Sequence, residues 1–172
     1  MDLYEAIQKR CSVRRWADKA VEEEKLRRVL EAARMAPSAK NMQEWRFVVV
    51  TDAQLRRKLG VAARNQEFVG QAPVVIAGCA TESHNVMACG QLSYPIDLAI
   101  AMEHLALAAA AEGLGTCWIG AFYEDQVKQV LGIPAEVRVV ELMPLGYPAA
   151  DLPSPRKSRK AYDEIVVRDR WR

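Results

Sequence analysis

The chain has 172 residues, 51% of them hydrophobic and 27% charged, and a formal net charge of +2 at pH 7. This length predicts one domain that buries about 70% of its unfolded surface, with a composition ordinary for a globular protein. A charge so close to zero does not favour nucleic acid or another polyanion as a partner. Residues 1–10 are charged and amphipathic, unlike a cleavable leader, so a cytoplasmic protein is expected.

The first 80 residues predict three helices and two buried strands. Capping residues, acidic first turns and apolar stripes indicate helices at 2–9, 21–35 and 53–63. Apolar runs rich in β-branched residues predict strands at 45–50 and 73–80. Residues 65–71 are expected to be a connecting segment.

Residues 93–115, SYPIDLAIAMEHLALAAAAEGLG, predict a long central helix. Ser93 suits the N-cap, and Gly113 suits a left-handed stop. Its roughly eighteen residues would span about 27 Å. It is apolar nearly all round, but Glu103 and His104 in its middle argue against a membrane span. We therefore expect a core helix whose burial is completed by a partner subunit.

The remaining chain predicts strands at 116–122 and 137–145 with a helix at 123–131 between them. The strands do not alternate polar and apolar residues, so both faces of the sheet should be covered, as in an α+β or α/β sandwich. Residues 149–172 have little core of their own, and we expect an arm that reaches a partner subunit.

The four cysteines, at positions 11, 79, 89 and 117, form no Cys-x-x-Cys pair and are expected as free, mostly buried thiols. Cys79, His84 and Cys89 match no standard zinc spacing, so no metal site is predicted. Gly113-Leu114-Gly115 follows a helix, the reverse of the order in a dinucleotide fingerprint. Neither histidine has an evident catalytic partner, so no side-chain acid–base dyad is predicted.

Three stretches carry groups that suit a ligand. Residues 10–15 and 156–160 combine basic side chains with hydroxyl groups, which suit a phosphate monoester, although each stretch alone is better explained as solvated surface. Residues 36–45 place small residues, a proline and two side-chain amides before a strand. Such a loop suits a planar heteroaromatic ligand or is an ordinary connection.

In this order, four stretches resemble the nitroreductase family of FMN-dependent oxidoreductases. Residues 10–14, RCSVR, resemble its Arg-x-Ser-x-Arg/Lys element, and residues 36–45, APSAKNMQEW, its Ala-Pro-Ser-x-x-Asn-x-Gln-Pro-Trp loop. Residues 107–122 are similar to its helix-to-strand segment, and residues 157–166 to its basic C-terminal element. The resemblance covers nearly the whole chain. It implies a single α+β domain with a mostly antiparallel sheet, in a domain-swapped homodimer with two FMN sites at the interface.

The resemblance also implies the cofactor-binding residues. The phosphate and ribityl end would be held by Arg10, Ser12, Lys157 and Arg159, with Cys11 between the first two. Arg14 would lie at the N1 and O2 edge of the flavin as an electrostatic stabiliser. The ring would be contacted by Pro37, Ser38, Ala39 and Asn41 of the other chain, by Asn65 and Gln66, and by the backbone of Ile119, Gly120 and Ala121.

The implied activity is reduction of nitroaromatics, quinones or related small acceptors by NAD(P)H, through flavin N5 and with ping-pong kinetics. A fixed cation such as Arg14 suits the negative charge that reduction places on N1 and O2. Glu44 stands where the family has proline, so the loop is looser or its rim more acidic. After Phe122 there is no long insertion that could form a lid.

Three alternatives remain open. The first is a specialised flavin chemistry such as reductive dehalogenation, which would need polar groups on a lid. The second is a non-enzymatic FMN carrier. The third is a basic module that binds nucleic acid, which the near-neutral charge disfavours.

Overall fold

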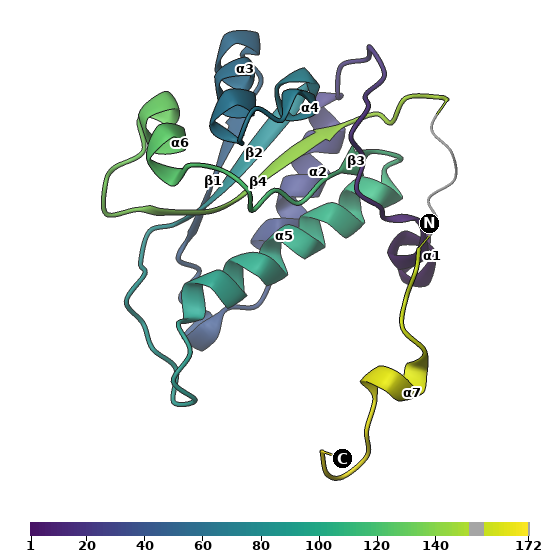
Figure 1. Ribbon diagram of the computed structural model, residues 1–172, viewed down its shortest axis with the longest axis vertical. Helices are drawn as coiled ribbons and strands as arrows, with labels where there is room; N and C mark the ends of the chain where they lie inside the picture. Colours follow the sequence, from purple (N-terminus) through teal and green to yellow (C-terminus); the bar gives the residue numbers. More distant parts are fainter. Residues whose placement is uncertain (152–156, 172) are drawn as a thin grey trace.

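The computed structural model describes residues 1–151 and 157–171. Helices cover both faces of a four-stranded antiparallel sheet (Figure 1). Its strands, in spatial order, are β1 (Trp45–Val50), β2 (Val74–Ala80), β4 (Arg138–Gly146) and β3 (Gly115–Thr116). The predicted α+β class, with an antiparallel sheet between helices, is confirmed.

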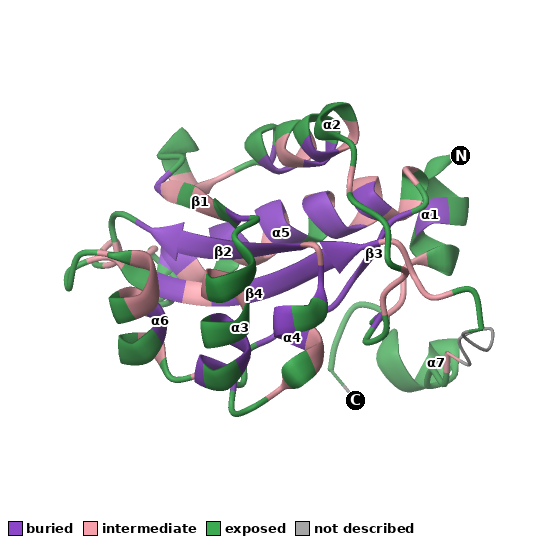
Figure 2. Ribbon diagram, turned by 90° about the horizontal axis from the view of Figure 1, so that it is seen from above, coloured by how far each residue is buried: buried purple, intermediate pink, exposed green. Residues whose placement is uncertain are grey.

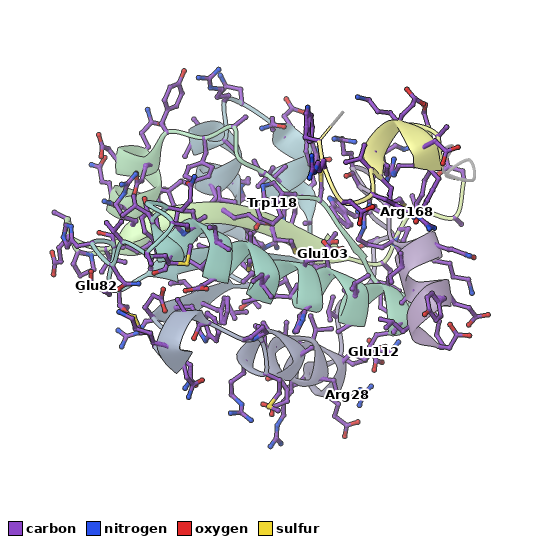
Figure 3. The ribbon with its side chains drawn as sticks, turned by 90° about the horizontal axis from the view of Figure 1, so that it is seen from below. Arg28, Glu82, Glu103, Glu112, Trp118 and Arg168 are labelled. Atoms are coloured by element: carbon purple, nitrogen blue, oxygen red, sulfur yellow. The ribbon has the colours of Figure 1, made fainter. Side chains whose placement is uncertain are left out.

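One face of the sheet is covered by α2 (Glu23–Arg34) and α5 (Ser93–Ala111). Apolar side chains from both helices pack on β2 and β4, among them Val29, Met102, Leu105, Ile76 and Met143. Arg28 of α2 donates from Nε and Nη2 to the carboxylate of Glu112, at 2.7 and 2.9 Å (Figure 3). This bidentate pair fixes α2 to the end of α5.

The other face is covered by α3 (Ala53–Ala62), α4 (Glu67–Gln71) and α6 (Glu124–Leu131). Figure 2 shows the strands buried between the two helical layers, whose outer surfaces are exposed. The helix α4 lies in the segment that we expected to be a plain connection. It packs so closely on α3 that a Cβ on Gly70 would stand only 3.0 Å from the carbonyl oxygen of Arg56.

The start of the central helix α5 differs from the sequence expectation. Leu92 is its N-cap, so the prediction that Ser93 caps it is wrong; Ser93 is a buried first-turn residue. Within the single chain the helix keeps an unburied side, where Ile96 is 41% exposed and Ile100 and Leu107 are half-buried. By length and composition α5 could cross a membrane, a test that core helices of soluble proteins also pass.

The strand expected at 116–122 is much shorter in the structure. After β3, the chain keeps contact with β4 through a bond from the Cys117 N–H to the Pro144 carbonyl, at 3.3 Å, and an isolated bridge between Ile119 and Leu142. The chain then leaves the sheet at Gly120. This departure exposes the backbone of 120–121 beside the sheet.

The two ends of the chain carry short helices, α1 (Leu3–Lys9) and α7 (Tyr162–Ile165). Asp2 caps α1, as expected. Beyond Lys157, the described tail is exposed in the single chain, with Trp171 94% exposed. Residue 156 of the second basic stretch lies outside the described residues.

Candidate active site

The first basic stretch runs along β3. Ser12 forms a parallel bridge with Thr116, and the Val13 N–H donates to the Thr116 carbonyl at 2.8 Å. Gly115 allows this approach, because a Cβ there would lie 2.5 Å from Cγ2 of Val13. The side chains of Arg10, Ser12 and Arg14 are thereby held along one border of the sheet.

Lys157 brings the second basic stretch to the same place. Its ammonium donates to the carbonyl of Ile7, at 2.9 Å, and to that of Gln8, at the C-terminal end of α1. Arg10 is the next residue after α1, and its Nε lies 3.7 Å from the carboxylate of Glu103. Two stretches about 150 residues apart in sequence therefore converge.

The other predicted phosphate contacts are less concentrated. Arg159 is exposed, and its guanidinium donates to the carbonyl of Ser158 at 2.8 Å rather than to the first basic stretch. Cys11 is half-buried between Arg10 and Ser12. Within one chain, Arg10, Ser12 and Lys157 make up the basic group.

Arg14 lies at the border of this group. Its guanidinium carbon stands 5.8 Å from the centroid of the Phe68 ring on α4, a contact that sequence reasoning missed. The buried thiol of Cys117 lies nearby: burial raises its pKa, while the charge of Arg14 and a hydrogen bond from Ser12 act in the opposite direction. Arg14 and Ser12 thus both lie close to Cys117, the residue that follows β3.

Residues 65–66 and 119–121 also meet. Gln66 donates from Nε2 to the carbonyl of Ala63 at 2.8 Å and to that of Ala121 at 3.2 Å. A Cβ on Gly120 would have one neighbour within 4 Å, Nε1 of Trp118 at 3.9 Å, so the space over this backbone is open. A flat ligand can therefore approach the backbone amides here.

The loop at 37–41 lies elsewhere in the single chain. The Ala39 N–H donates to Oδ1 of Asp97 at 3.1 Å, which fixes the loop to the first turns of α5. Figure 1 shows α1 at the opposite end of that helix. The structure thus does not bring Pro37, Ser38, Ala39 and Asn41 to the other predicted site residues within one chain.

Backbone strain is concentrated in the two loops expected at the ring. Non-glycine residues adopt positive φ at Lys40, Asn41 and Gln43 (52°, 56° and 51°) and at Arg64 and Asn65 (57° and 59°). Such conformations cost of order 1–3 kcal/mol each and cluster at functional sites.

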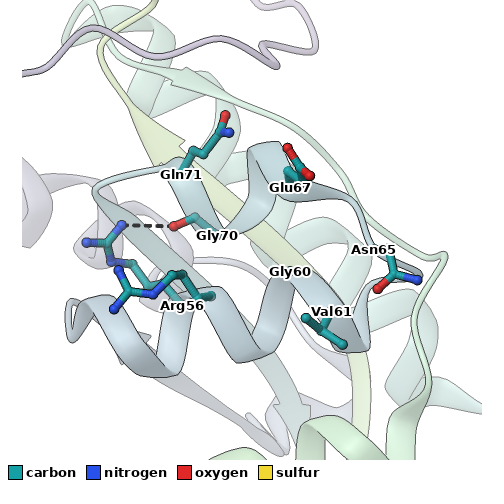
Figure 4. A pocket seen from close by; sticks show the side chains of 8 residues that line it. Arg56, Gly60, Val61, Asn65, Glu67, Gly70 and Gln71 are labelled. Carbon is teal, nitrogen blue, oxygen red and sulfur yellow. Dashed lines mark hydrogen bonds between the residues drawn. The ribbon is translucent and has the colours of Figure 1, made fainter.

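A groove of about 530 Å³ lies between α3 and α4, with Asn65 at its rim (Figure 4). In this groove the guanidinium group of Arg56 donates to the carbonyl of Gly70, at 3.2 Å, and to that of Ala72. These bonds stabilise the contact between the helices. Asn65 is the predicted cofactor-binding residue that lines this groove.

Comparisons with known proteins identify the family of the chain. The family model described as "Nitroreductase family" matches residues 7–74 and 61–147. A putative NADH dehydrogenase/NAD(P)H nitroreductase of Methanothermobacter thermautotrophicus is 35% identical over 87% of this chain and 78% of its own. A nitroreductase family protein of Clostridium novyi superimposes with a TM-score of 0.82, at 39% identity over 86% of this chain and 87% of that one. An NADPH:FMN oxidoreductase of Vibrio harveyi, complexed with NAD+, gives a TM-score of 0.88 at 25% identity, over 99% and 78% of the two chains.

The fold and these comparisons together define an NAD(P)H oxidoreductase. The chain belongs to the nitroreductase family, enzymes of the FMN-dependent NAD(P)H oxidoreductase class. The residues present fit FMN: two cations and a hydroxyl suit a phosphate, and open backbone beside a fixed guanidinium suits the polar edge of a flat ring. Among the described residues, no cluster of side chains that could hold a metal ion was found.

Proposed function

We propose that this chain binds FMN between two subunits and uses NAD(P)H to reduce nitroaromatics, quinones or related small acceptors in ping-pong fashion. The observation that carries the proposal is the bond from the Lys157 ammonium to the carbonyl of Ile7 in the last turn of α1, just before the segment with Arg10 and Ser12. Bound FMN supplies the transfer of hydride and electrons between donor and acceptor. The name of the Vibrio harveyi relative, with FMN, NADPH and NAD+ in it, supports both cofactors.

The chain's own residues hold and polarise the cofactor. Arg10, Ser12 and Lys157 bind the phosphate, with Cys11 and Arg159 at its ribityl side. Arg14 stands at the pyrimidine edge, where its fixed charge stabilises the reduced state more than the oxidised one. The amides of Gly120 and Ala121, after Ile119, face the reacting side of the ring, and Asn65 with Gln66 bonds its edge.

A second chain completes the site. The unburied stripe of α5, with Ile96, Ile100 and Leu107, leaves apolar surface exposed at helical spacing. The tail adds exposed Tyr162 and Trp171. We infer a cytoplasmic homodimer of single-domain chains in which these surfaces meet, residues 149–172 reach across, and the partner's loop 37–41 lies on the ring.

Purified protein tests this function directly. It should be yellow, and either NADH or NADPH should bleach the flavin without oxygen in an anaerobic stopped-flow mixture. Nitroaromatic or quinone acceptors should then reoxidise it at rates independent of the nucleotide concentration. Protein that stays colourless with added FMN contradicts the proposal, whereas bound FMN that neither nucleotide reduces indicates a carrier. Reoxidation by a haloaromatic alone indicates the dehalogenating alternative.

A further inference from the structure

Two acidic side chains face each other in the protein interior below the loop 37–41. Glu44 precedes β1 and is 5% exposed, and Asp97 of α5 is 4% exposed. The Ser93 hydroxyl donates to Oε1 of Glu44 at 3.2 Å, and the Ala39 N–H donates to Oδ1 of Asp97. In the described part of the chain, the second oxygen of each carboxyl, Oε2 and Oδ2, has no partner.

The two carboxyl groups can satisfy each other only through a proton. Burial raises the pKa of Glu44, and so do the hydrogen bond and the charge of Asp97. Two ionised carboxylates in contact repel, and in such pairs one group keeps its proton. The Glu44 O–H is then the donor that Oδ2 of Asp97 otherwise lacks.

Charged groups on the surrounding elements lie in solvent. Lys40, on the same loop as Glu44, is exposed and directed to Asn85 at 3.5 Å. Glu82 and His84 of the segment before α5 and Arg46 of β1 are exposed as well. Solvent and salt screen such charges strongly, so burial and then Asp97 are the influences that raise the pKa of Glu44.

We propose that Glu44 and Asp97 share one proton, and that this carboxyl pair fastens the 37–41 loop to α5 so that losing the proton releases the loop and weakens FMN binding. The inference rests on the proposed function, because the loop is taken to cover the flavin of the partner subunit. Asp97 links the shared proton to the loop, because its carboxylate also accepts the hydrogen bond from the Ala39 N–H. Both residues are positioning residues, without contact to the reacting atoms.

The direction of the pH effect follows from the raised pKa of Glu44. The pair's stabilisation is complete below the ordinary carboxyl pKa of 4.5 and is lost as the pH rises through the raised value, when the proton leaves to solvent. The Glu44 carbonyl stays bound by the N–H and hydroxyl of Thr81, at 2.7 and 2.9 Å. The displacement is therefore confined to the loop that precedes Glu44.

The test measures FMN dissociation constants by flavin fluorescence, from about pH 5, near the ordinary carboxyl pKa, to about pH 9, in wild type, Glu44→Gln and Asp97→Asn. A glutamine donates to Asp97 without a proton to lose, and an asparagine at 97 donates to an ionised Glu44. We expect the wild-type constant to rise about fivefold or more over this range, and those of both variants less than about twofold. Glu23→Gln, an exposed change on α2, should follow the wild type.

A second measurement needs no cofactor. Denaturant unfolding of the FMN-free protein should show a lower midpoint at the alkaline end in the wild type, and Glu44→Gln should reduce that loss. Equal pH profiles in wild type and both variants would overturn the shared proton. Failure of every form to bind FMN at any pH would instead overturn the proposed function, and the unfolding comparison would still decide on the carboxyl pair.

Discussion

Arg10→Ala is expected to weaken FMN binding about 10- to 100-fold, because a charge-assisted bond to a phosphate contributes about 1.5–3 kcal/mol. Lys157→Ala should act in the same direction, since its ammonium bonds to carbonyls in the last turn of α1, directly before Arg10. Titration of the FMN-free variants with FMN, followed by fluorescence quenching, gives the constants. The loss should be visible already as pale protein on purification.

Riboflavin separates this effect from a general disturbance. It lacks the phosphate, so Arg10→Ala should change riboflavin binding by less than about threefold. Arg15→Ala is the matched control, because Arg15 lies on the same segment but bonds to Asp151. Equal losses for FMN and riboflavin would show that Arg10 supports the fold and not the phosphate.

Glu141→Gln is expected to remove most of the alkaline destabilisation of the protein. Glu141 is 0% exposed on β4, and neither carboxylate oxygen has a partner among the described residues. Burial, with a smaller effect of the Glu103 charge, raises its pKa to about 9. The folded state therefore keeps a proton that the unfolded chain gives up from about pH 4.5, and the unfolding free energy falls by about 1.4 kcal/mol per pH unit up to about pH 9.

Urea unfolding at about pH 5 and about pH 8 measures this difference. The advantage of Glu141→Gln over wild type should grow by up to about 4 kcal/mol between the two. Glu136→Gln, an exposed change just before β4, should leave the wild-type profile intact. Identical pH dependence in wild type and Glu141→Gln would mean that Glu141 is ionised within the fold.

The sheet and its helices could be predicted because their signals are local. The apolar runs of β1, β2 and β4 and the capped, periodic helices match the structure within two residues at most ends. The five-residue α4 was missed, since a segment so short is held by its packing on α3 rather than by its own pattern. The strand at 116–122 was overestimated because the single bridge at Ile119 depends on the partner strand, which local sequence does not encode.

The site was predictable from motif order but not from local chemistry. Each basic stretch alone was better explained by solvation, and only the folded chain brings Lys157 to the last turn of α1, directly before Arg10. The contact of Arg14 with Phe68 and the pairing of Glu44 with Asp97 involve residues 54 and 53 positions apart, which no local pattern signals. The one hint was Glu44 in place of the family's proline.

The proposed FMN site needs residues from two copies of the chain. Mixing the subunits of two variants tests this requirement most directly. Arg10→Ala impairs the phosphate half, whereas Ala39→Trp would fill the space above the ring. Each variant alone should bind little FMN. In a shared site, a mixed dimer carries one doubly impaired and one intact site, so co-refolded variants should regain about one quarter of wild-type FMN binding. A mixture that binds no more FMN than the two variants separately would contradict a site built from two chains.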